Sequence, residues 1–552
     1  MNKPTFLKIN TILFFLMLCI ASQAQNTLGT TFVKAGVYEG LTLMSVNTKA
    51  FLFNNCGEVI NEWTSDYKPG NAVYLLTNGN LLRAGQVESG SSITMGGAGG
   101  IVELFDWDGN LLWSYVVNDD QKRQHHDIYP MPNGNVLILA ATAMTEQEAL
   151  EAGRNSSRLP DKRLYNEQIM ELEPVGSNQA NLVWEWNINQ HLVQDFDATK
   201  SNYGVVSARP EKLDINFLNG GTGEENWLHF NSIQYDETLD QIVISCRNLS
   251  EIYIIDHSTT TLEAAGSTGG TYGKGGDILY RWGNPQAYQQ GSEANRILYG
   301  QHYPHYIKEG LTDAGKIIVF NNGFGRTPDF SEVMIINPPV NSPGVYIKQT
   351  DAAFGPEQAD EVYADLSEIP SPFFSRIVSS AQRLPNGNTL ICEGINGEIF
   401  EIDANGDLVW TYINPVGNND LNIPNQGEEL TDSNLIFRAK KYPLDFPAFA
   451  GRDLSPGNPI EGNPDLSKCY EVLSTKDALT STLTIYPNPA SNLIHLEGFE
   501  NHDKIEIFNL QGKLLLSSSG VTSVDISSLA KGIYILRAGH AKRRITKKII
   551  KK

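Results

Sequence analysis

One segment of the chain reads Pro385-Asn386-Gly387-Asn388-Thr389-Leu390, and it leads into Ile402-Asp403-Ala404-Asn405-Gly406-Asp407-Leu408-Val409-Trp410. Asn-Gly pairs favour tight hairpins because asparagine and glycine tolerate the positive φ angles that such turns require. The apolar residues that alternate beside each turn are typical of half-buried strands. This unit therefore predicts antiparallel β-strands, the last of which ends in a tryptophan.

The same unit recurs along the chain. Residues Asn78–Leu82 lead to Phe105–Trp113 in a second clear copy, and Pro132–Leu137 begin a third. With the weaker copies there are about six units of roughly forty to sixty residues, a period expected for propeller blades. Radial repetition buries each sheet between its neighbours and leaves only short edges exposed. The repeat therefore predicts an all-β fold with a β-propeller of five, six or seven blades.

The N-terminal segment 1–25 is predicted to be a secretory signal peptide. Lys3 and Lys8 precede the apolar run Ile12–Ile20, and small residues follow up to Ala24. No later run is long and apolar enough to cross a bilayer. The net charge of −21 argues against a sequence-independent nucleic-acid binder, because such proteins need basic surface. We expect an exported chain with no transmembrane segment and no nucleic-acid partner.

The cysteines leave two possibilities open. Beyond the signal segment the chain has Cys56, Cys246, Cys392 and Cys469, none of them in a CxxC spacing, which argues against a metal knuckle. An oxidising compartment permits disulfides. Cys246 and Cys392 lie inside apolar strand patterns, where a buried free thiol is as well accommodated as a bridge.

A separate module begins near residue 481. Its sequence contains Leu483–Ala490, Lys504–Asn509 and Leu529–Leu536, and it closely resembles the C-terminal sorting domain of type IX secretion. The resemblance implies a small β-sandwich that is recognised by the type IX machinery and removed as the cargo crosses the outer membrane. The protein would then be secreted or held at the cell surface, with the periplasm as a stage in transit. The predicted divisions are signal peptide 1–25, propeller 26–445, linker 446–480 and sorting domain 481–552.

Histidines occur in three similar phrases of the propeller segment. These are Gln124-His125-His126-Asp127, Trp227-Leu228-His229-Phe230-Asn231 and Gly300-Gln301-His302-Tyr303-Pro304-His305. Each phrase precedes a strand pattern of a different repeat. In a repeated all-β chain, strand starts from different repeats can bring three imidazoles together, which is the site hypothesis. His191 and His257 lack such a context and are expected in loops or at the surface.

Five phrases follow one another between Asp106 and Trp410. They are His125-His126-Asp127 with Pro132–Asn135, Trp227–Ile233, Ile244–Arg247, Gly300–His302 and Asn321–Gly323. In order and spacing they resemble the bacterial arylsulfate sulfotransferase family. The resemblance implies a six-bladed propeller with its active site at the central channel. It also implies transfer of a sulfuryl group from a phenolic sulfate ester to a phenolic acceptor, with no nucleotide donor and no cofactor.

The resemblance also implies roles for individual residues. His302 would be the nucleophile that becomes transiently sulfated, and His126, His229 and Arg247 would surround the sulfuryl oxygens. The residue types suit this chemistry independently, because a neutral imidazole can accept and release a transferred group. A guanidinium fork suits the charge that spreads over sulfuryl oxygens.

Three further residues are expected to contact substrate. Asn231 would be a supporting polar contact, while His125 and His305 each neighbour a favoured histidine. A shift of one residue in the alignment with the family would exchange the roles of His125 and His126. The spacing of His302 and His305, together with Asp127, is also compatible with a metal, but Pro304 favours an irregular loop over a helix, so no metal site is predicted.

Other functions compete with sulfuryl transfer. In one alternative the histidines are structural and Arg247 forms an ion pair between blades, because buried arginines are usually paired. The chain would then be a non-catalytic secreted or surface propeller that binds glycans or proteins. A hydrolase that uses the same site, with water in place of the phenol, is a third possibility.

Overall fold

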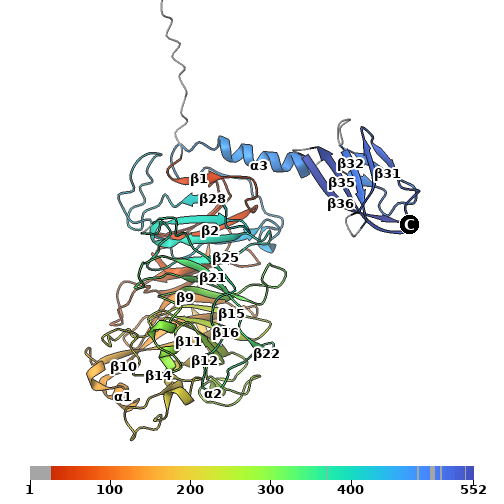
Figure 1. Ribbon diagram of the computed structural model, residues 1–552. Helices are drawn as coiled ribbons and strands as arrows, with labels where there is room; N and C mark the ends of the chain where they lie inside the picture. Colours follow the sequence, from red (N-terminus) through yellow and green to blue (C-terminus); the bar gives the residue numbers. More distant parts are fainter. Residues whose placement is uncertain (1–25, 369, 481–483, 498–503, 510–512, 541–542) are drawn as a thin grey trace, which may run out of the picture.

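The computed structural model describes residues 26–368, 370–480, 484–497, 504–509, 513–540 and 543–552. The predicted signal peptide lies outside these residues. Within them the chain forms a six-bladed β-propeller and a smaller C-terminal β-sandwich (Figure 1). The fold class predicted from the sequence is confirmed, and the number of blades is six.

Each blade is an antiparallel sheet of four strands, and the last blade has a fifth strand. From the inner strand outward, the first three blades are β29 (Lys440–Pro443), β2 (Gly40–Val46), β3 (Lys49–Phe53) and β4 (Val59–Thr64); β5 (Pro69–Leu75), β6 (Leu81–Gln86), β7 (Gly100–Phe105) and β8 (Leu111–Val116); and β9 (Lys122–Pro130), β10 (Val136–Thr145), β11 (Arg163–Val175) and β12 (Gln179–Asn187). The others, in the same order, are β15 (Phe230–Asp236), β16 (Gln241–Cys246), β17 (Glu251–Asp256) and β18 (Tyr280–Trp282); β19 (His302–Tyr306), β20 (Ile317–Asn321), β21 (Glu332–Ile336) and β24 (Glu361–Tyr363); and β25 (Ser380–Arg383), β26 (Thr389–Glu393), β27 (Glu398–Ile402), β28 (Leu408–Ile413) and β1 (Gly29–Val33).

The two ends of the propeller segment close the ring. Strand β29 pairs with β2 of the first blade, and β1 pairs with β28 of the last blade. The adjoining inner strands are joined by the Gln382 amide, which donates to the Lys441 carbonyl at 2.9 Å and accepts from the Lys441 N–H at 2.9 Å. Two late strands that pair with early ones thus hold the first and last blades together.

The repeat-ending tryptophans hold neighbouring blades together. The indole N–H of Trp63 donates to the Asp106 carbonyl of the next blade, and Trp113 donates to the Gln179 carbonyl, each at 2.8 Å. Trp410 closes the series with a 2.7 Å bond to the Asn55 carbonyl. A buried indole needs such a partner. The tryptophan of the sequence repeat is therefore an element of packing between blades.

The remaining elements lie outside the blade sheets or in the sorting domain. Helices are α1 (Glu146–Glu151), α2 (Thr261–Ala264) and α3 (Ser467–Thr480), with short 3-10 turns at Ser156–Arg158, Ile188–His191, Val206–Ala208, Pro285–Tyr288, Glu293–Asn295, Gly394–Asn396 and Pro447–Phe449. Small strand pairs are β13 (Leu192–Val193) with β14 (Leu213–Asp214) and β22 (Val340–Ser342) with β23 (Val345–Tyr346). The sandwich packs β30 (Thr484–Tyr486), β31 (Leu493–Glu497) and β34 (Ser523–Asp525) against β33 (Leu514–Ser519), β32 (Lys504–Phe508), β35 (Gly532–His540) and β36 (Arg543–Lys551).

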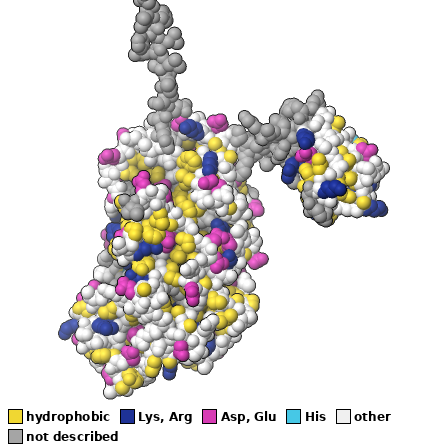
Figure 2. Space-filling model, in the orientation of Figure 1, with side chains coloured by type: hydrophobic (Ala, Val, Ile, Leu, Met, Phe, Trp, Pro, Cys, Tyr) yellow, Lys and Arg dark blue, Asp and Glu magenta, His cyan; other side chains and the backbone are white. Residues whose placement is uncertain are grey.

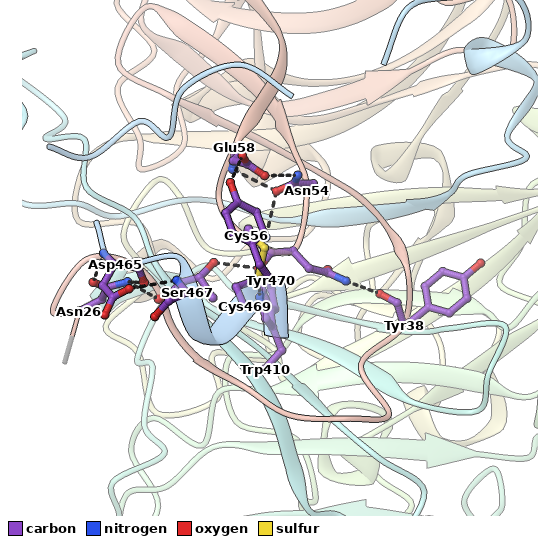
Figure 3. Close-up of a disulfide and its surroundings, with 12 residues drawn as sticks. Asn26, Tyr38, Asn54, Cys56, Glu58, Trp410, Asp465, Ser467, Cys469 and Tyr470 are labelled. Atoms are coloured by element: carbon purple, nitrogen blue, oxygen red, sulfur yellow. Dashed lines mark hydrogen bonds between the residues drawn. A yellow bond between two sulfur atoms is a disulfide. The ribbon is translucent and has the colours of Figure 1, made fainter. Parts of the chain in front are cut away.

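A disulfide joins Cys56 of the first blade to Cys469 of α3 (Figure 3). Cys246 and Cys392 are buried free thiols. Beside the disulfide, the Tyr470 hydroxyl donates to Glu58 at 2.5 Å. The end of the segment predicted as a linker is therefore attached to the propeller. The predicted domain boundaries remain predictions.

The surface carries both signs of charge. On the face shown in Figure 2, Lys and Arg side chains are interspersed with Asp and Glu. None of the helices in the described ranges is long and apolar enough to span a membrane.

Candidate active site

Irregular backbone lies at or beside each of the three histidines. His126 and His229 have positive φ angles of 51° and 53°, and Tyr303, next to His302, has 54°. The pairing of β9, β15 and β19 with their neighbours shifts register at these positions. Such bulges re-aim side chains and are over-represented beside active sites. The histidine phrases thus lie in or at the start of the inner strands, and Pro304 belongs to a bulged strand β19 rather than to a loop.

The bulges bring the imidazoles together. The His126 and His229 rings are 4.6 Å apart between centroids, and Phe437 lies 6.2 Å from His126 and 6.4 Å from His302. His126 and His302 are buried, whereas His229 and Arg247 are partly exposed. The open side of the site is therefore the side of His229 and Arg247.

His302 is held as a neutral imidazole in one tautomer. Its Nδ1 lies 2.7 Å from Oδ1 of the buried Asn322, so Nδ1–H donates and Nε2 keeps its lone pair. Burial, followed by the charge of Arg247, lowers the pKa of His302 to about 3. The bond to Asn322 and an interaction with the Gly300 backbone oppose this lowering without reversing it, and in this tautomer the nitrogen without a proton is Nε2. This nitrogen is unprotonated and available near neutral pH.

His126 ends a relay that begins at a buried carboxylate. Glu167 accepts from His125 Nε2–H at 2.9 Å, which leaves His125 Nδ1 to accept from His126 Nδ1–H at 2.9 Å. His126 Nε2 therefore carries a lone pair. Burial and then the charge of His229 keep the pKa of His126 well below its usual value. His125 is fully buried, so its position favours support of His126 over direct contact with substrate.

His229 and Arg247 present donors. The Asn226 Nδ2 amide lies 2.7 Å from His229 Nδ1 and donates to it, so that the proton of the neutral ring is on Nε2. Arg247 donates to Asn248 Oδ1 at 3.1 Å and forms no ion pair with any described carboxylate. The alternative of an ion pair between blades is thus not supported. A guanidinium without an acidic partner is suited to an anion.

Asn231 and His305 lie differently from the sequence expectation. Asn231 is buried and donates to the Gln301 carbonyl at 2.8 Å, which fixes the backbone beside His302. His305 lies further along β19, where its ring packs 4.4 Å from Tyr303 and its Nδ1–H donates to the Tyr303 carbonyl at 3.1 Å. The structure therefore separates His305 from the histidine cluster.

Asp127 and His191 both form buried polar contacts. Asp127 pairs with Arg438 at 2.9 Å, and no group of metal-ligating side chains suited to an ion occurs within the described ranges. The prediction that His191 lies in a loop or at the surface is wrong. Its side chain is fully buried and stacks on Trp186, and its Nδ1 lies 2.8 Å from Asp277 Oδ1. Its burial in the blade core could not be read from its flanking residues.

Several residues of the site were not predicted from the sequence. Phe437 resembled an ordinary core residue, and Glu167 is one of several carboxylates in a long strand. Gly97 was overlooked although it lies against His126: a Cβ at this position would be 2.2 Å from His126 Nε2. The four glycines at 96, 97, 99 and 100 were the available signal for this close approach.

The family model described as arylsulfotransferase (ASST) matches residues 31–406, which include strands of all six blades but end before β28 and β29. The chain belongs to the arylsulfotransferase family. A second family model, the secretion system C-terminal sorting domain, matches residues 484–552 of this arylsulfotransferase family member and indicates secretion or surface export. No curated protein matches the chain.

Solved structures that resemble the chain do so at low sequence identity and with low TM-scores. A protein of unknown function from Bacteroides caccae is 12% identical, covers 68% of this chain and 93% of its own, and gives a TM-score of 0.36. A catalytically inactive virginiamycin B lyase from Staphylococcus aureus is 12% identical over 70% of this chain and 88% of its own, with a TM-score of 0.31. The periplasmic gluconolactonase of Pseudomonas aeruginosa is 9% identical over 68% and 95%, with a TM-score of 0.33. These likenesses carry no argument about function.

Proposed function

We propose that the protein is an aryl-sulfate sulfotransferase that moves a sulfuryl group from a phenolic sulfate ester to a phenolic acceptor through a sulfohistidine on His302. No nucleotide donor takes part. The observation that carries the proposal is the free Nε2 of a neutral, buried His302, held by Asn322. Family membership supports the same reaction class.

In the first half-reaction, His302 Nε2 attacks sulfur. An N–S bond forms, the S–O bond to the aryl group breaks, and the electron pair leaves with the phenolate. His302 keeps its Nδ1–H, whose bond to Asn322 offsets the charge that develops on the ring. An aryl oxide is a good leaving group, so this step needs little proton donation.

In the second half-reaction, the acceptor phenol attacks the sulfuryl group. His126 Nε2 accepts the phenol proton, an O–S bond forms, and the N–S electron pair returns to His302. The relay through His125 to Glu167 stabilises the imidazolium of His126, as a buried carboxylate does in hydrolase triads. The proton then leaves His126 for solvent, which returns the ring to its neutral state.

Charge on the sulfuryl oxygens is stabilised by fixed donors. His229 Nε2–H and the Arg247 guanidinium are assigned this role, and preorganised donors in a partly dry site contribute most to such transition states. Asn231 acts through the Gln301 backbone, and His125 acts through His126. His305 is assigned no direct role.

Purified protein, a chromogenic aryl sulfate and a phenol test the proposal. We expect phenolate release that depends on the phenol and is lost in His302→Ala. Colour without the phenol would favour the hydrolase, and tight binding of glycans without turnover would favour the non-catalytic propeller. Secretion follows from the sorting domain, and we propose that a signal peptide and passage through the periplasm precede it.

A further inference from the structure

A second arginine lies beside the site on a loop that is anchored to the nucleophile's own partner. The Asn322 amide that accepts from His302 also donates, through Nδ2, to the Ser375 carbonyl at 2.7 Å and the Val378 carbonyl at 3.0 Å. Arg376 lies between these two anchored residues. One buried side chain thus fixes both the His302 ring and the loop that carries Arg376.

The loop is held in a costly conformation. Val378 has a φ of 53°, a region that β-branched residues rarely adopt. The next residue, Ser379, has a φ of 91°, and its N–H bonds the Phe437 carbonyl at 3.1 Å. Such backbone persists when the surroundings determine it, and it is concentrated at functional sites. Several hydrogen bonds therefore fix the backbone on both sides of Arg376.

Arg376 has no partner of opposite charge. It is exposed, and it forms no hydrogen bond or ion pair through its side chain with any described residue. Its positive charge acts on Arg247, whose pKa is lowered by burial first and by Arg376 second. The two guanidinium groups thus act on each other, and neither forms an ion pair with a described carboxylate, an arrangement that a bound anion would relieve.

The two arginines differ in depth. Arg247 is partly buried beside the histidines. A Cβ atom added at Gly300 would lie 3.8 Å from the Arg247 guanidinium, so this backbone passes close to it. Arg376 is exposed and lies further outward. A substrate that places its sulfuryl group at His302 and Arg247 extends its aryl ring toward the open side. The far end of that ring is the part that Arg376 can reach.

We propose that the site prefers phenolic substrates with an acidic substituent, such as a carboxylate, on the ring, and that Arg376 is the residue that recognises it. The inference rests on the proposed sulfuryl transfer. In a two-step reaction the donor's leaving group and the acceptor occupy the same place in turn. The preference therefore applies to both.

The test compares two acceptors of equal size, 4-hydroxybenzoate and 4-hydroxybenzamide, with 4-nitrophenyl sulfate as the donor. For the wild-type protein, kcat/KM for the carboxylate should exceed that for the amide by about threefold to fivefold, the effect of one partly exposed charge pair. Added salt should reduce this ratio, because exposed charges are screened. Arg376→Gln should bring the ratio to about one, and Arg376→Lys should keep part of it.

The matched control is Arg209→Gln, which should leave the ratio unchanged. Arg209 is an exposed arginine whose neighbour Pro210 accepts a hydrogen bond from Arg281 of the outer strand β18. Equal melting temperatures of all variants show that each one is folded. A ratio that is the same in Arg376→Gln and wild type would overturn the inference while leaving sulfuryl transfer in place. No transfer to any phenol would overturn the proposed function and this inference together.

Discussion

Asn322→Ala tests whether the free Nε2 of His302 depends on its fixed tautomer. The Asn322 side chain is buried and makes three hydrogen bonds, one from His302 and two to the loop at 375–378. The substitution removes all three. The imidazole can then rotate or move its proton to Nε2, and both changes remove the nucleophilic lone pair from the site.

The structure offers a close control in the preceding residue. Asn321 is equally buried. It makes three hydrogen bonds with nitrogen or oxygen partners, at Tyr299, Ile297 and Glu332, at 2.8, 3.1 and 3.0 Å, and a longer one to the Met334 sulfur at 3.7 Å. At about 1 kcal/mol for each bond, both alanine variants should lose about 3 kcal/mol of unfolding free energy. Only Asn322→Ala touches His302. We expect kcat/KM to fall about a hundredfold in that variant, the cost of a misplaced reacting group, and by less than about threefold in Asn321→Ala.

Two measurements separate the effects. Urea unfolding gives the stability of each variant, and colour release from a chromogenic aryl sulfate with a phenol gives kcat/KM under conditions where both variants are folded. Equal losses of activity in Asn321→Ala and Asn322→Ala would refute the reasoning. So would full activity of Asn322→Ala.

Three more predictions follow from the site and the fold. Gly97→Ala should abolish turnover because its Cβ meets His126 Nε2, whereas Gly109→Ala, also at positive φ but with open space, should lose stability only; steady-state rates and melting curves compare them. Because the pKa of His302 is about 3, its imidazole stays neutral down to about that pH. The fall in rate on the acid side of the pH–rate profile should therefore lie well below pH 6.5. Between pH 6.5 and about 3 the unfolded chain binds a proton that the folded chain does not, so stability should fall as pH falls, by up to about 1.4 kcal/mol per pH unit for this histidine; urea midpoints across that range check the sign. Cys56→Ser should lower the unfolding free energy by about 2–5 kcal/mol in non-reducing buffer and should remove the effect of dithiothreitol on the melting temperature.

The hairpins could be predicted because their signals are local. Gly387 and Gly406 both adopt the positive φ that the Asn-Gly turns require, at 89° and 84°. The six-blade count could not be derived from the pattern alone, because ring closure depends on pairing β1 and β29 with strands far away in sequence. These closing strands are short and have weak periodicity.

The candidate site divides in the same way. His126, His229 and His302 could be found because each belongs to a repeated phrase at one end of an inner strand. The sequence could not decide between His125 and His126, since the bulge in β9 alone determines which ring faces the channel. Arg376 gave no signal, because it lies in an irregular loop whose position depends on a tertiary contact with Asn322.

The central claim is that His302 carries the sulfuryl group between donor and acceptor. The most direct measurement mixes the protein with an aryl sulfate in the absence of a phenol, stops the reaction rapidly, and maps modified peptides by mass spectrometry. The account predicts one burst of phenolate with one sulfuryl group on the peptide that contains His302, both absent in His302→Ala and discharged by added phenol. Phenolate release without a protein-bound sulfuryl group, or a sulfuryl group on another residue, would contradict it.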